Sequence, residues 1–142
     1  MCGSKCSVKL MLMETLFIPA TKTTPQVDFN TSTNVFELKG RSIPADAMTF
    51  YQPLERWCDY YANNTTQTSI AVEVKLDHLN TGSVRALLSA FTKLLKARDR
   101  GVKVQINWYH DVEDEDMMDK GEEISLILDH PFKYIAVRSE DY

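Results

Sequence analysis

The fold of this chain is decided by the stretch LDHLNTGSV, residues 76–84, where a strand gives way to a helix. Over residues 69–76, apolar side chains alternate with small or polar ones, as in a strand with one buried face. Beyond the turn, a single apolar stripe recurs at helical spacing and comprises Val84, Leu87, Leu88, Phe91, Leu94 and Leu95. We therefore predict a strand, a short turn, and a helix over residues 83–98 that stops at Gly101.

Small hydroxyl residues, Thr81 and Ser83, stand where this helix should begin. The first N–H groups of a helix lack partners within it, and the helix dipole makes this end partly positive. A phosphate, which adds a charge of about −1.5 to −2, is favoured there, so the position suits a reversible phosphorylation switch. The plainer alternative is that Asn80, Thr81 or Ser83 only caps the helix, and a hydroxyl engaged in a cap would be a poor kinase substrate.

The pattern upstream predicts a β-hairpin followed by a helix. Residues 26–29 and 35–39 both alternate apolar with polar side chains, and a cluster of turn residues separates them. A short extended segment over residues 16–19 precedes the hairpin. A helix is predicted over residues 45–62, with Pro53 inside its pattern, on an apolar face of Phe50, Leu54, Trp57, Cys58 and Tyr61.

Downstream, the pattern predicts a strand over residues 102–108, a helix over residues 111–128 and a last strand over residues 132–137. The helix has an acidic first half and is weakened or bent at Gly121. Strands that alternate with helices indicate right-handed crossovers and a largely parallel sheet. The predicted fold class is α/β: one domain with a mixed, mostly parallel sheet of four to five strands and three main helices.

Length and composition narrow the classes of function. With 142 residues, 44% of them hydrophobic, the chain is expected to form one domain over residues 13–142. Residues 1–12 are expected to be a poorly ordered extension, and Met1, Met11 or Met13 could be the true start. The net charge of −4 argues against nucleic-acid binding, and no apolar run approaches the roughly 20 residues of a membrane span. Three cysteines without a disulfide framework point to the cytoplasm.

Other chemistry has weaker support. The acidic run 111–116 lacks the spacing of a calcium loop and reads as a solvated first helical turn, although residues 111–120 could dock a basic partner. His78, His110 and His130 are scattered without metal spacing, and we predict no metal or cofactor. A small hydrolase or transferase using His78 with Asp77 is the alternative function. Neighbouring strand residues point to opposite faces, which weakens it.

Four segments carry a resemblance to a known family: Thr24-Pro25, FELKGRSIP (residues 36–44), LDHLNTGSVR (residues 76–85) and VQINWY (residues 104–109). Read together, they resemble the SiaC family of bacterial regulatory phosphoproteins over residues 14–137. The Leu-Asn-Thr-Gly-Ser-Val element before the helix is the most specific part. Gly82 stands where some members of the family have serine.

The resemblance implies a STAS-like fold, similar to that of anti-sigma factor antagonists. It implies that a dedicated serine/threonine-type kinase phosphorylates a threonine of the Leu-Asn-Thr element, here Thr81, and that a metal-dependent phosphatase removes the phosphate. It further implies that the unmodified protein binds and activates a diguanylate cyclase, and so promotes cyclic-di-GMP signalling and biofilm formation.

We therefore expect a non-enzymatic signalling protein in which the state of Thr81 controls the binding of a target. The exposed face of the helix over residues 83–98 and the turn before it should form much of the docking surface. The residues predicted to lie on that surface are Asn80, Gly82, Ser83 and Arg85, with Ser89 and Thr92 as weaker candidates.

Overall fold

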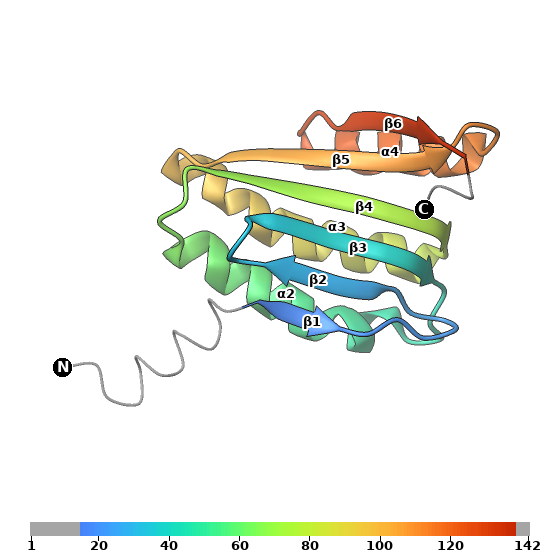
Figure 1. Ribbon diagram of the computed structural model, residues 1–142, viewed down its shortest axis with the longest axis horizontal. Helices are drawn as coiled ribbons and strands as arrows, with labels where there is room; N and C mark the ends of the chain where they lie inside the picture. Colours follow the sequence, from blue (N-terminus) through green and yellow to red (C-terminus); the bar gives the residue numbers. More distant parts are fainter. Residues whose placement is uncertain (1–14, 139–142) are drawn as a thin grey trace.

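The computed structural model describes residues 15–138, which form one six-stranded sheet with three α-helices packed on one of its faces (Figure 1). The predicted extension over residues 1–12 lies outside the described residues. In chain order the elements are β1 (Leu16–Ile18), β2 (Gln26–Asn30), β3 (Val35–Ser42), α2 (Ala47–Asn64), β4 (Ser69–Leu79), α3 (Thr81–Leu94), the 3-10 helix η1 (Leu95–Arg100), β5 (Lys103–Asp111), α4 (Glu115–Leu128) and β6 (Lys133–Val137).

The strands lie side by side in the order in which they occur in the chain. β1, β2 and β3 form an antiparallel meander, whereas β3, β4, β5 and β6 are parallel and are joined by the helices. Successive crossovers that step in one direction with one hand place their helices on the same face of a sheet. The predicted mixed, mostly parallel α/β sheet is confirmed, and the sixth strand is the short segment β1.

The core lies between the sheet and the helices. Alternate strand residues point into it, and a cluster of aromatic rings from β2, β3 and α2 fills one half. Within that cluster Trp57 and Tyr61 stack at 4.9 Å, and Phe29 and Phe36 stack at 5.0 Å. The core placement of Trp57 and Tyr61 is confirmed. Phe50 is only half-buried, and its neighbour Tyr51, which the helical pattern passed over, is fully buried.

A bulge between β3 and β4 explains why β4 runs to Leu79, three residues beyond the prediction. Gly40 pairs with Leu76 and Arg41 with His78, so that Asp77 is an extra residue on β4. Gly40 has a φ of +120°, a conformation that suits glycine and permits the irregularity. The extra residue resets the alternation, so Leu79 points into the core and the chain enters α3 at Thr81 rather than at Ser83.

The third helix begins at Glu115 instead of Asp111, because β5 continues to Asp111, which pairs with Val137 of β6. Asp114 caps the helix by accepting a hydrogen bond from the backbone N–H of Met117 at 3.0 Å. Gly121 lets this helix approach the sheet, because a Cβ at that position would lie 2.6 Å from Nε1 of Trp108. The same Nε1 donates a hydrogen bond to the carbonyl of Met117 at 2.9 Å.

Candidate functional site

The candidate site lies at the edge of the sheet where β3, β4 and β5 end and the helices begin (Figure 1). Thr81 is the first residue of α3, and its side chain is exposed. Because β4 delivers the chain to this edge from the centre of the sheet, the N-terminus of α3 is flanked by α2 on one side and α4 on the other. The predicted position of Thr81 at the N-terminus of a helix is therefore confirmed.

Asn80, and not Thr81, caps the helix. Its Oδ1 accepts a hydrogen bond from the backbone N–H of Ser83 at 2.9 Å, while its Nδ2 donates to the carbonyl of Pro44 at 3.0 Å. The cap therefore stabilises α3 and ties its start to the β3–α2 loop. The sequence left open which residue performs this role. With Asn80 in the cap, the hydroxyl of Thr81 is not needed for it.

Ser83 was predicted to lie on the docking surface, and this placement is wrong, because Ser83 is fully buried. Ser83 lies two residues after Thr81, about half a helical turn further on, so its side chain points towards the sheet, where its Oγ donates to the carbonyl of Ser42 at 3.0 Å. The hydroxyl of Ser42 in turn donates to Oγ of Ser83 at 2.7 Å. Ser83 therefore holds the helix N-terminus in place and is not available to a kinase or a partner.

Tyr51 completes this buried chain of hydroxyl groups. Its Oη lies 2.5 Å from Oγ of Ser42, and since Ser42 donates to Ser83, the tyrosine is the donor to Ser42. Burial raises the pKa of Tyr51 to about 12, which keeps that donor protonated. The resulting network joins α2, β3 and α3, and every hydroxyl in it has a partner.

Sequence reasoning missed Ser42 and Tyr51. Ser42 belongs to the segment FELKGRSIP that carried the family resemblance, but nothing local marked it as buried. The bulge beside Gly40 turns its side chain towards α3, and its carbonyl also accepts a hydrogen bond from the backbone N–H of Asn80 at 3.0 Å. The signal available in the sequence was a serine placed between a glycine, Gly40, and a proline, Pro44.

The remaining predicted surface residues differ in exposure. Arg85 is exposed one turn after Thr81, on the same side of the helix. Gly82 and Asn80 are half-buried, and a Cβ at Gly82 would lie 3.4 Å from Cβ of Ala47, which is an ordinary van der Waals contact. Thr92 is exposed but donates to the carbonyl of Leu88 at 2.6 Å.

A lysine that the sequence did not single out also reaches this edge. Lys120 of α4 donates a hydrogen bond from its Nζ to the carbonyl of Leu79 at 2.8 Å. The same ammonium group lies 3.0 Å from a carboxylate oxygen of Asp116, one turn earlier in α4. The ammonium group of Lys120 is thus held beside Leu79, which stands two residues before Thr81 in the chain.

Exposed apolar side chains surround the same edge. Among the described residues, Ile43 after β3 is 36% exposed, Met48 in the first turn of α2 is 52% exposed and Val112 after β5 is 56% exposed. Single exposed apolar residues are common, but these three follow or begin elements that meet at one edge of the sheet. The surface near Thr81 therefore combines apolar and charged groups, as protein interfaces do.

The histidines do not assemble a catalytic site. Asp77 and His78 do not point to opposite faces as predicted, because the bulge places both on the surface, with Nδ1 3.3 Å from Oδ1. Nε2 of His130 bonds to the carbonyl of Val104 at 2.8 Å, and desolvation lowers its pKa. Among residues 15–138, no group of histidine, cysteine and carboxylate side chains is arranged to hold a metal, and no helix is long and apolar enough to cross a membrane.

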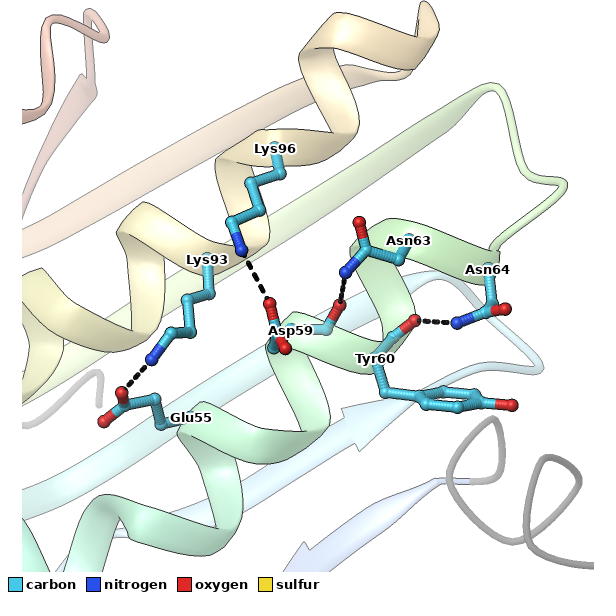
Figure 2. A network of polar contacts seen from close by, with 7 residues as sticks. All are labelled: Glu55, Asp59, Tyr60, Asn63, Asn64, Lys93 and Lys96. Atoms are coloured by element: carbon cyan, nitrogen blue, oxygen red, sulfur yellow. Dashed lines mark hydrogen bonds and ion pairs between the residues drawn. The ribbon is translucent and has the colours of Figure 1, made fainter.

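The last turn of α3 and the 3-10 helix η1 that follows it are held differently. Lys93 and Lys96 form ion pairs with Glu55 and Asp59 of α2, the second pair at 2.8 Å (Figure 2). The hydrogen bond from Lys93 lowers the pKa of Glu55, and the same bond raises the pKa of Lys93. At the end of α2, the amides of Asn63 and Asn64 donate to the carbonyls of Asp59 and Tyr60, both at 2.8 Å (Figure 2). The two ion pairs therefore join α2 to the end of α3 and to η1 on the outer surface, whereas the two amide hydrogen bonds lie within α2.

The described residues thus form an α/β domain whose helices cover one face of the sheet and whose central helix presents an exposed threonine at its N-terminus. The chain belongs to the SiaC family: the model of the SiaC family regulatory phosphoproteins matches residues 18–137. The resemblance predicted from the sequence is thereby confirmed. As a member of this family the chain is a regulatory protein and not an enzyme.

One curated relative is similar in sequence, and solved structures share the fold. The protein called Uncharacterized protein PA14_02130 of Pseudomonas aeruginosa strain UCBPP-PA14 is 24% identical over 129 residues, covering 91% of this chain and 99% of the relative. The fold matches a chain in the crystal structure of the diguanylate cyclase SiaD in complex with its activator SiaC from Pseudomonas aeruginosa, with a TM-score of 0.77, 23% identity and coverage of 86% and 99%. It also matches apo-SiaC of that organism with a TM-score of 0.76, 21% identity and coverage of 87% and 99%.

Proposed function

We propose that this protein is a partner switch in which unmodified Thr81 permits binding to a diguanylate cyclase and phosphorylated Thr81 prevents it. A dedicated kinase and a phosphatase would set the state of Thr81. Since a kinase draws on nucleoside triphosphate, we place the exchange in the cytoplasm. In this way the protein would link a phosphorylation signal to cyclic-di-GMP production and biofilm formation.

The exposure of Thr81 is the observation that carries the proposal. Asn80 supplies the cap, and Ser83 is turned inward, so Thr81 is the hydroxyl of this turn that lies on the surface. A kinase can therefore reach the hydroxyl of Thr81 without unfolding the first turn of α3. The helix dipole then favours the product, because the added negative charge lies at the positive end of α3.

A diguanylate cyclase is the favoured target because a SiaC chain of the same fold is the activator of the cyclase SiaD in the complex from Pseudomonas aeruginosa. The docking surface would include Thr81, Gly82 and Arg85, together with the exposed apolar residues of the same edge. A phosphate placed within such a surface must lose water when the partner binds. A loss of about 3 kcal/mol would weaken binding roughly 150-fold, which is enough for a switch.

A capture experiment from host cells tests the proposal. The bait proteins are wild type, a form carrying genetically encoded phosphothreonine at position 81, and Thr81→Val, which keeps the shape of the side chain. We expect the wild type and Thr81→Val to retain a diguanylate cyclase, identified by mass spectrometry, and the phosphothreonine form to lose it. Equal retention by all three would contradict the proposal.

Phosphate mapping tests the acceptor separately. Incubation with host lysate and ATP should label Thr81 in the wild type and should leave Thr81→Val unlabelled in the segment of residues 76–85. Gly82→Ser is the matched control, because the neighbouring site accepts a Cβ without a clash and Thr81 is intact. Phosphate found on Ser83 would contradict both the assignment and the observed burial of that residue.

A further inference from the structure

We propose that Lys120 is the internal counter-ion of the Thr81 phosphate: on phosphorylation its ammonium group leaves the carbonyl of Leu79 and pairs with the phosphate. The inference rests on the proposed function, in that it assumes phosphorylation of Thr81. It adds a residue of α4 to the switch. Phosphorylation of Thr81 on α3 then also changes the contacts of a side chain on α4.

The position of Lys120 supports this role. Its Nζ lies 2.8 Å from the carbonyl oxygen of Leu79, and Thr81 is two residues further along the chain. The lysine side chain is 29% exposed, so it is not enclosed by the core. A long lysine chain can swing through a few ångströms without any movement of the backbone. Lys120 can therefore reach a phosphate on Thr81 from the place it already occupies.

The present partners of Lys120 are ones that it can exchange. The carbonyl of Leu79 is a neutral acceptor, and the carboxylate of Asp116, at 3.0 Å, is 79% exposed and so is screened by water. A phosphate offers a larger charge and three acceptor oxygens, which form stronger hydrogen bonds with a cation than a neutral carbonyl does. The exchange is thus favoured in the modified state and absent in the unmodified one.

Lys120 and Arg85 approach Thr81 from different helices. Ser83 faces the sheet and Gly82 faces Ala47 of α2, so Thr81 and Arg85 share the outward side of α3. Arg85 follows Thr81 by one turn and remains solvated, whereas Lys120 comes from a different element. Pairing with Lys120 therefore draws the phosphate towards α4 and changes the surface that a partner meets.

The test uses the full chain with genetically encoded phosphothreonine at position 81 and follows the phosphate by phosphorus NMR as the pH is varied. A nearby lysine should hold the second pKa of the phosphate below its ordinary value of about 6. We expect Lys120→Gln to raise this pKa by about half a unit and Lys120→Arg to restore it. Lys133→Gln, which removes an exposed lysine of β6, should leave it unchanged.

The outcomes separate the inference from the proposed function. An equal phosphate pKa in the wild type and in Lys120→Gln, with both proteins folded by circular dichroism, would overturn the role of Lys120. If the cyclase is then still lost on phosphorylation, the switch itself stands. If instead the pKa depends on Lys120 but the phosphorylated protein still captures the cyclase, the counter-ion is supported and the proposed function fails.

Discussion

At its N-terminus, α3 is fastened to β3 and α2 by buried hydrogen bonds between neutral groups, whereas its last turn and the following η1 are held to α2 by ion pairs on the surface (Figure 2). The first set resists salt and is costly to break, because a buried hydroxyl without a partner loses its hydration. The second set is screened by salt and contributes little. Strong fixation is thus concentrated at the end of α3 that carries Thr81.

The largest effect should come from Ser42→Ala at the buried end. The substitution removes the acceptor for Oη of Tyr51 and one of the two hydrogen bonds of Ser83, whose Oγ still donates to the carbonyl of residue 42, and we expect the free energy of unfolding in urea to fall by about 2–3 kcal/mol. Tyr51→Phe added to Ser42→Ala should recover part of the loss, because it removes the hydroxyl that Ser42→Ala leaves without a partner. A loss below about 0.5 kcal/mol would show that the network does not fasten α3.

Loss of the cap should have the next largest effect. Asn80→Ala removes the acceptor for the N–H of Ser83 and the donor to Pro44, and should cost about 1–2 kcal/mol of unfolding free energy. Asn80→Asp keeps the acceptor but not the donor, and so serves as the matched control with a smaller loss. An equal loss in both variants would assign the stabilisation to the contact with Pro44 alone.

A change of pH sharpens the comparison, because His130 contacts Arg98 of η1, beyond the C-terminal end of α3. Its pKa is lowered chiefly by desolvation, with Arg98 adding repulsion, so the folded state favours the neutral ring. The unfolded chain then takes up the proton first as the pH falls below about 6.5, and stability declines from there downwards. His130→Gln should show a shallower decline in urea midpoint between pH 7.5 and 5.5. The same slope in both proteins would contradict this.

The smallest effect should lie in the exposed ion pair between Asp59 and Lys96. A double-mutant cycle with Asp59→Asn and Lys96→Gln should give a coupling energy of about 0.2–0.5 kcal/mol in low salt. In 1 M sodium chloride the coupling should vanish, because the screening length shrinks to about 3 Å. A coupling above about 1 kcal/mol that survives salt would remove the contrast between the two ends of the helix.

Much of the fold could be predicted because its signals are local. The alternation in β2 and β3 and the apolar stripe of α3 each lie within a single element, and they identified the hairpin and the central helix. The ends of elements were less accurate where distant pairing decides them. β4 runs to Leu79 because of the bulge opposite Gly40, and β5 runs to Asp111 because Val137 pairs with it.

The residues of the candidate site likewise divide into those that adjacent sequence predicts and those that distant contacts decide. Thr81 was predicted from a hydroxyl at the start of a helix and from the resemblance, both of which depend on adjacent residues. The burial of Ser83 could not be predicted, since it depends on a contact with Ser42, which lies on another strand. Lys120 was missed for a similar reason, because only the packing of α4 against β4 brings it to Leu79.

The contact between Trp108 and Gly121 has a consequence for how this sequence can diverge. Any residue with a side chain at 121 would occupy space that the indole ring already fills, so the two positions are free to change only together. Descendants that acquire alanine or serine at 121 should also carry a smaller residue at 108. Because Gly121 directly follows Lys120, such paired replacements would also shift the position of the Lys120 ammonium group relative to the end of β4.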